Sequence, residues 1–211
     1  WGWNAWSLEH LGFATWAPTR DEVLQRVPAK LAEYGAWLAH HGEPWQAGHA
    51  GSIEIVEEIA GDEVAFRDDL LPAPVAAIAR CERWLAYTRS DLLRTVAPLP
   101  DDVLDWDPPY RHFAPHAWWR TIRQILQHIA FTEIGYYLPS IGWRPEVDPA
   151  ALRDAGWEEM LQRSRAETLR CLAALKEDSD TVRAHFGEET WSVRKVLRRL
   201  VWHERLHWKS I

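Results

Sequence analysis

Residues 192–207 read SVRKVLRRLVWHERLH and decide the fold of the second half of the chain. Apolar and histidine side chains recur in this stretch at i, i+4, i+7 and i+11, and they are Val196, Leu200, His203 and His207. Side chains with this spacing share one face of an α-helix. We therefore expect a helix over residues 190–209 whose two histidines face the interior of the protein.

The same pattern of residue types occurs earlier in the chain. Residues 121–127 (TIRQILQ) align with residues 192–198 (SVRKVLR), and residues 88–94 (TRSDLLR) align with residues 164–170 (SRAETLR). Each half therefore predicts a helix, a loop and a second helix. Two such αα-hairpin repeats, packed together, give an all-α, up-down four-helix bundle. The expected helices are residues 75–97, 117–138, 157–176 and 190–209.

The beginning of the chain follows a different pattern and predicts a small α+β domain. Loose alternation over residues 1–17 predicts one or two short strands that bend near Gly12. Thr19 and Glu22 have the spacing of a capping box, which predicts a helix start, and apolar residues then recur at helical spacing over residues 20–41.

Residues 53–59 (IEIVEEI) alternate strictly at their start and predict a further strand. After them, residues 61–74 carry charges and two prolines without a clean period, which is typical of a linker. We therefore divide the chain into an α+β domain at 1–60, a linker at 61–74 and a helical domain at 75–211.

Two motifs in the first domain are shared with a known family. Residues 11–16 (LGFATW) and 19–22 (TRDE), followed by the long helix and the 53–59 strand, resemble the antitoxin-like fold of the HicB family. The resemblance covers about residues 1–60. It implies a fold and a role in homodimer formation or in binding a protein partner, and it implies no activity.

A third histidine of the helical domain lies on an inward stripe of its own. Ile125, His128 and Thr132 share one face of the helix expected over residues 117–138. In a bundle, metal sites are built from side chains on facing helices. Three neutral imidazoles form a complete catalytic zinc set with one position left for water or substrate, and they also suit nickel or iron(II).

The helical half also shares a set of residues with a known family. They are Trp119, Ile122, Arg123, Leu126, His128, Glu133, Trp191, Ser192, Val193, Arg194, Leu197, His203 and His207. The set resembles the DinB/YfiT-like family of metal-binding four-helix bundles, over about residues 75–211. The resemblance implies one divalent metal ion on His128, His203 and His207. Some members of that family are bacillithiol S-transferases, mycothiol-dependent maleylpyruvate isomerases and glutathione-dependent enzymes.

Two functions of different class follow from these observations. The first is a metal-dependent enzyme, a thiol S-transferase or a hydrolase, acting on a small molecule with a low-molecular-weight thiol. The second is a non-catalytic, metal-stabilised binding or regulatory protein whose antitoxin-like domain binds a partner. A zinc-protease interpretation of His203–His207 as H-E-x-x-H is disfavoured, because that motif needs a third ligand downstream and only four residues follow His207.

Four further residues are candidates around this site. Glu133 either orients a ligand imidazole or is a solvated charge on the helix face. Glu204 is either a carboxylate on the protein surface or, like Glu133, a group that supports a metal ligand. Trp119 and Tyr136 are candidates for lining a substrate pocket, although Tyr136 and its neighbour Tyr137 could also serve only in packing.

Composition excludes several other classes of protein. A formal net charge of −7 argues against a nucleic-acid-binding surface, which should be basic. No window approaches the length of about 18 uncharged apolar residues needed to span a membrane, and no signal segment opens the chain. Cys81 and Cys171 lie far apart, which fits two buried thiols in a reducing cytoplasm.

Overall fold

The computed structural model describes the whole chain except residues 1, 46–52, 110–116, 118, 178–182 and 188. The elements in chain order are β1 (Trp3–Trp6), β2 (Ala14–Ala17), α1 (Arg20–His40), η2 (Asp68–Leu70), α2 (Val75–Val96), α3 (Asp101–Leu104), α4 (Ile122–Thr132), η3 (Glu133–Tyr137), α5 (Leu138–Ser140), α6 (Pro149–Arg153), α7 (Trp157–Glu177), β3 (Arg183–Phe186), β4 (Glu189–Ser192) and α8 (Val193–Trp208).

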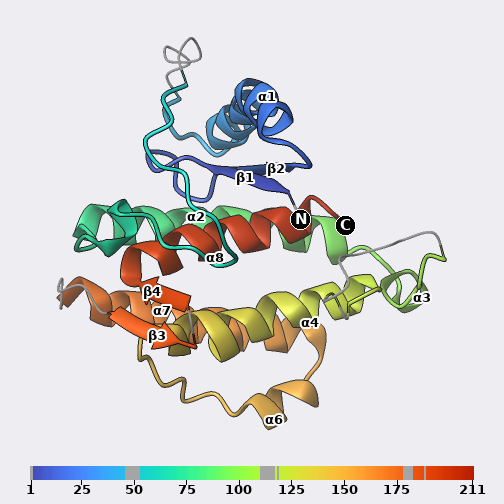
Figure 1. Ribbon diagram of the computed structural model, residues 1–211. Coiled ribbons are helices and arrows are strands. Elements are labelled where there is room, and N and C mark those ends of the chain that lie inside the picture. The colour runs from blue at the N-terminus through green and yellow to red at the C-terminus, as the bar shows by residue number, and fades with distance from the viewer. Residues whose placement is uncertain (1, 46–52, 110–116, 118, 178–182, 188) are drawn as a thin grey trace.

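The long helices α2, α4, α7 and α8 form a bundle of two layers (Figure 1). In one layer α2 lies against α8, and in the other α4 lies against α7. The two helices of each layer run in the same direction. In the layer of α4 and α7 this is possible because residues 141–156, which connect them in sequence, run back along the outside of the bundle. The order is therefore up-down-down-up, and the expected up-down order is corrected.

The predicted hairpins are also paired differently from expectation. The main neighbour of α2 is α8, from the other half of the chain, and the main neighbour of α4 is α7. The contacts show that α2 and α8 are parallel. Cys81, near the start of α2, donates to the Leu197 carbonyl near the start of α8, and Trp208, at the end of α8, donates to Thr95 near the end of α2. The two halves therefore interlock, and the sequence repeat itself stays a prediction.

The second half of the chain is not all helical, contrary to our expectation. The antiparallel hairpin β3–β4, with Arg183 opposite Ser192, precedes α8. Gly187 adopts a φ of 63° at its turn, a conformation that glycine tolerates best. Ser192 then caps α8 by accepting from the Lys195 amide, so the helix begins at Val193 rather than at 190.

The N-terminal residues form a two-stranded sheet and one helix, as predicted for 1–41. β1 pairs with β2 in antiparallel register, and the predicted capping box of Thr19 and Glu22 starts α1. The sheet lies between α1 and the bundle (Figure 1). Gly12, with a φ of 79°, lets the chain approach α8 closely, because a Cβ there would lie 2.4 Å from Val201 Cγ1.

The expected strand at 53–59 is absent, which corrects the prediction. Residues 53–60 have no strand pairing, and Ile53, Ile55 and Val56 are all exposed. Alternation alone does not make a strand, because a strand also needs a partner for its backbone groups. The third strand on which the HicB resemblance depended is therefore missing.

The segment expected as a linker is fastened to the bundle. Asp69 in η2 is buried and pairs with Arg198, and its carbonyl accepts from Ser192. Arg194 also pairs with Asp68. The segment 61–74 therefore packs on α8 and is not an extended linker. The domain boundaries at 60 and 74 stay a prediction.

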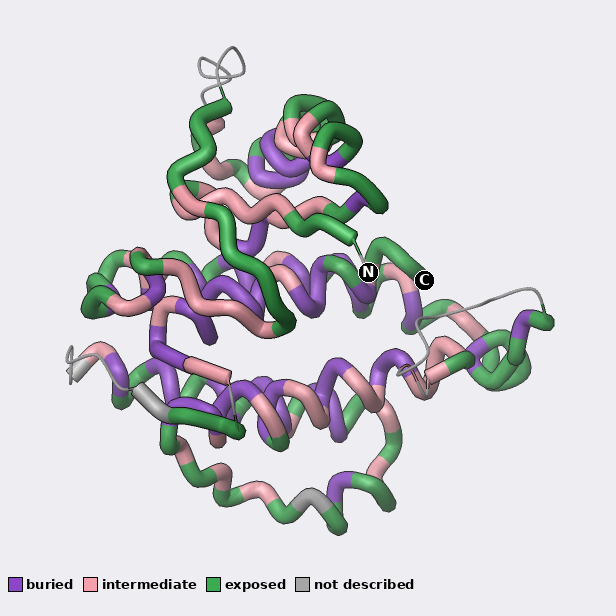
Figure 2. Tube along the Cα trace, viewed as in Figure 1, coloured by how far each residue is buried: buried purple, intermediate pink, exposed green. Residues whose placement is uncertain are grey.

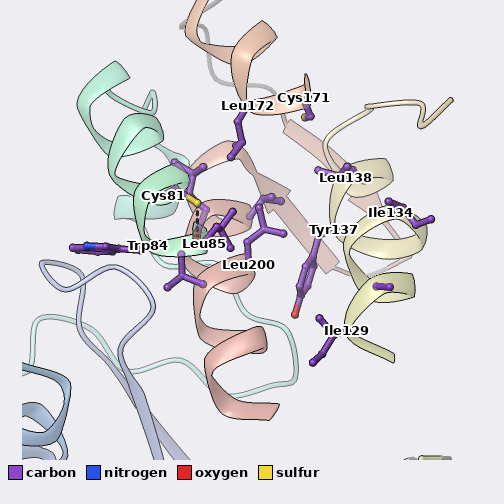
Figure 3. Packing of buried hydrophobic residues seen from close by; sticks show 14 of the residues in the cluster. Cys81, Trp84, Leu85, Ile129, Ile134, Tyr137, Leu138, Cys171, Leu172 and Leu200 are labelled. Carbon is purple, nitrogen blue, oxygen red and sulfur yellow. Dashed lines mark hydrogen bonds between the residues drawn. The ribbon is translucent and has the colours of Figure 1, made fainter. Parts of the chain in front are cut away.

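The hydrophobic core runs between the two layers of the bundle. Figure 2 shows buried residues along the facing sides of the long helices. Leu85, Ile129, Leu172 and Leu200 bring one side chain from each of these helices into it (Figure 3). Cys81 and Cys171 are free and fully buried, as expected. Within the described part of the chain, no helix combines the length and the apolar character that a membrane span requires.

Candidate metal centre

Three histidine side chains converge between the two layers of the bundle. His128 comes from α4, and His203 and His207 come from successive turns of α8. One nitrogen from each ring lies within 4.8 Å of the others. His203 and His207 are buried and His128 is half-buried. The three residues that sequence periodicity placed on inward stripes therefore form one cluster.

Aromatic rings enclose the cluster. Trp119 stacks on His128 with ring centroids 3.6 Å apart and lies nearly perpendicular to the ring of His207, at 5.5 Å between centroids. Tyr137 stands nearly perpendicular to His203, at 88° and 5.6 Å between centroids. Of the two expected pocket residues, Trp119 therefore touches two histidines of the cluster.

The surroundings favour the neutral form of His203, the form that binds a metal. Burial lowers the pKa of His203 well below its ordinary value, and the neighbouring His207 and His128 lower it further. Thr132 Oγ1 lies 3.3 Å from His128 Nδ1, which leaves the Nε2 atom of that ring facing His203. Thr132 shares the inward stripe of His128, and its contact with that ring was not predicted.

The chemistry and spacing of the cluster fit one divalent ion. The Nε2 atoms of His128 and His203 are 2.9 Å apart, close enough for both to bind the same ion. Among the described residues, no carboxylate or thiol joins the three histidines. An ion held here would therefore keep coordination positions for water or substrate.

Glu133 and Glu204 belong to a separate polar cluster, which we call the arginine–glutamate quartet: Arg89, Glu133, Arg165 and Glu204. Arg165 donates to both carboxylates, and Arg89 pairs with both as well. Thr88 and Thr168 add one hydroxyl bond each to Glu204 and Glu133. Both glutamates are buried, so the solvated or surface role considered for them is wrong.

The quartet is balanced in charge and nearly symmetric. Arg89 Nη1 donates to the Leu161 carbonyl, and Arg165 Nη1 donates to the Leu85 carbonyl. The two arginines thus tie α2 and α7 to each other and, through the glutamates, to the two helices that carry the histidines. Although burial opposes its ionisation, Arg165 and Arg89 hold the pKa of Glu204 at about 2. Among the described residues, the ion pairs of both carboxylates are made with these two arginines.

Tyr136 and Tyr137 lie side by side but have different surroundings. The Tyr136 hydroxyl donates to Glu189 of β4. Burial raises the pKa of Tyr137 above its ordinary value, so its hydroxyl stays protonated at neutral pH. Our sequence reasoning singled out Tyr136 as the pocket residue, and the ring that reaches His203 is Tyr137.

Comparison with known proteins agrees with this architecture. The family model of the DinB superfamily matches residues 85–211, so the chain belongs to the DinB superfamily. The match includes all three histidines and does not extend to the first 84 residues, which leaves the HicB resemblance without support. No curated protein and no solved structure matches the chain.

Proposed function

We propose that His128, His203 and His207 bind one divalent metal ion, and that the protein uses it to transfer a low-molecular-weight thiol to an electrophilic small molecule. The observation that carries this proposal is the convergence of three imidazole nitrogens with no fourth protein ligand among the described residues. Zinc is the first choice, and nickel and iron(II) suit the same donors. Membership of the DinB superfamily supports the proposal.

The ion, when bound, would supply a Lewis acid that favours the thiolate form of a thiol. In the reaction, the sulfur forms a bond to an electrophilic carbon, the leaving group departs with its bonding electron pair, and the thiol proton passes to water. Thr132 would hold the His128 ring in place. Trp119, stacked on His128, would keep water from that side and offer an aromatic surface to substrate.

Metal analysis tests the first half of this proposal. Protein purified without a nickel column should contain about one divalent ion per chain. His128→Ala and His203→Ala should lower metal affinity to a similar extent. His40→Ala, which changes an exposed histidine on α1, is the matched control and should keep full affinity. Protein that binds no metal would refute the site.

A substrate panel tests the second half. Glutathione, cysteine and other small thiols are offered with 1-chloro-2,4-dinitrobenzene, with and without added zinc. We expect conjugation that needs both the metal and the three histidines. If metal binds but no thiol is transferred with this or other electrophiles, the enzyme proposal fails.

One observation favours a second candidate, a metal-stabilised binding or regulatory protein. The N-terminal sheet packs on α8, the helix that bears two of the three histidines, through Trp6 and Trp202 with ring centroids 4.9 Å apart. A protein partner or a second copy bound to residues 1–60 would then act on the metal helix. Metal-dependent binding without turnover would select this candidate. The free, buried cysteines support a reducing compartment such as the cytoplasm for either one.

A further inference from the structure

Tyr137 occupies an unusual place in the bundle. It is the last residue of η3 (Glu133–Tyr137), a π-helical turn that interrupts the regular helix after α4. Such turns carry one extra residue and occur often at functional sites. Tyr137 is only 3% exposed. The π-turn thus brings a phenol into the interior directly after the helix that carries His128.

The side chain of Tyr137 is directed back along α4. Its ring packs against Trp191 and His203, at 5.6 Å between centroids in each case. Figure 3 shows the ring between α8 and the helix of Ile129, with its hydroxyl oxygen pointing toward Ile129. Side chains on helices lean toward the N-terminus, which explains this direction. His203, one of the three clustered histidines, packs against the same ring, so this phenol borders the histidine cluster.

The hydroxyl of Tyr137 has no protein partner in the described part of the chain. By contrast, the Tyr34 hydroxyl donates to the Leu11 carbonyl, and the Tyr136 hydroxyl donates to Glu189. The Tyr137 oxygen is not one of the described polar atoms that are wholly enclosed without a partner, so a small part of its surface is accessible. A hydroxyl at this place, beside His203, is free to donate to a ligand bound at the cluster.

We propose that Tyr137 contacts the substrate, and that its hydroxyl donates a hydrogen bond to the ligand held at the metal centre. The inference rests on the proposed function for the identity of that ligand. It favours a ligand whose acceptor atom lies close to the ion, such as a thiolate sulfur or the end of a small anion. Tyr136, whose hydroxyl is already used by Glu189, takes no part.

Cobalt-reconstituted protein provides a test that does not depend on turnover. Azide and 2-mercaptoethanol are titrated into wild-type protein, Tyr137→Phe and Tyr136→Phe, and binding is followed by the visible spectrum of the cobalt. Phenylalanine keeps the ring that packs on Trp191 and His203, and circular dichroism checks the fold. Cobalt affinity is measured in each variant, so that loss of the ion is separated from loss of the probe.

We expect Tyr137→Phe to weaken probe binding by about three- to tenfold, the effect of one lost hydrogen bond. Its cobalt affinity should stay within about twofold of wild type, and Tyr136→Phe should match wild type for both probes. Equal azide binding by wild type and Tyr137→Phe would overturn the inference, even if the thiol binds. The inference would also be overturned if Tyr137→Phe lost cobalt affinity by the same factor as it lost affinity for azide. If azide is sensitive to Tyr137 but no thiol binds to wild-type protein, the inference stands and the thiol-transfer proposal fails.

Discussion

The interior of the bundle holds two polar clusters of opposite character. In the arginine–glutamate quartet, two positive and two negative groups satisfy one another, helped by threonine hydroxyls and backbone carbonyls. In the histidine cluster, three rings of the same kind converge, and no carboxylate among the described residues offsets them. A charge-balanced cluster stabilises the fold, whereas three converging imidazole nitrogens without a carboxylate have the composition of a metal site.

The largest expected effect comes from breaking the quartet. Glu133→Ala should lower the free energy of unfolding of the metal-free protein by about 3–5 kcal/mol, because Arg165 and Arg89 then lose a buried partner. Urea denaturation measures it. The control is Glu159→Ala, which removes an exposed ion pair with Arg163 and should cost less than about 1 kcal/mol. Equal losses in the two variants would show that the quartet is not a structural centre.

The histidine cluster should stabilise the protein only when an ion is present. With free zinc at one hundred times its dissociation constant, the free energy of unfolding should rise by about 2.7 kcal/mol. His203→Ala should abolish this rise, and His40→Ala should keep it. Thermal melts with and without a chelator measure the change. A wild-type protein that unfolds without metal would contradict the separation of the two clusters.

Lys195 lies on α8, two turns before His203, and belongs to neither cluster. It is fully buried and donates to the carbonyls of Glu63 and Thr190. Burial lowers the pKa of Lys195 to about 8, against about 10.4 in an unfolded chain. The folded state therefore binds this proton less tightly than the unfolded state. Its contribution to stability should rise as the pH increases from about 8 to about 10.4, by on the order of 2 kcal/mol.

Denaturation of wild-type protein and Lys195→Met across this pH range checks that sign. The difference between the two proteins isolates Lys195 from the tyrosines and other lysines, which titrate in both. Lys195→Met should lack the rise that Lys195 contributes. Parallel curves for the two proteins would refute it.

The smallest expected effects come from two threonines, one beside each cluster. Thr132→Val removes the bond to His128 and should weaken metal affinity about tenfold while changing the stability of the metal-free protein little. Thr168→Val removes a bond to Glu133 and should lower the free energy of unfolding by about 1–3 kcal/mol without changing metal affinity. Isothermal titration with zinc and urea denaturation give both quantities. If both threonines change both quantities alike, the clusters are one unit.

Local patterns predicted much of the fold and the histidine cluster. Thr19 and Glu22 located the start of α1, and the helices expected at 75–97 and 157–176 match α2 and α7 closely. The inward stripes of α4 and α8 predicted that His128, His203 and His207 face one another, and the structure places them in one cluster. These features depend on contacts within one helix or on which face of a helix is buried. The spacing of residues in the sequence indicates both.

The remaining features depend on partners that are distant in the chain. The quartet joins Arg89 to Glu204 across 115 residues, and no local pattern of either helix indicates that bond. A signal was available, because Arg89 and Arg165 occupy matching positions in the two aligned segments. The parallel pairing of the helices and the missing strand at 53–59 also depend on long-range packing, which periodicity does not record.

The cover that the N-terminal sheet provides over α8 has a consequence for how the metal centre is reached. Trp6 and Gly12 press on Trp202 and Val201, so the outer side of α8 is closed by the chain itself. His203 and His207 are thereby fixed in a wall that has packing on both sides. His128 is half-buried and is covered by the ring of Trp119. We therefore expect α8 to form the rigid side of the metal centre, closed to substrate by the N-terminal sheet that packs on it.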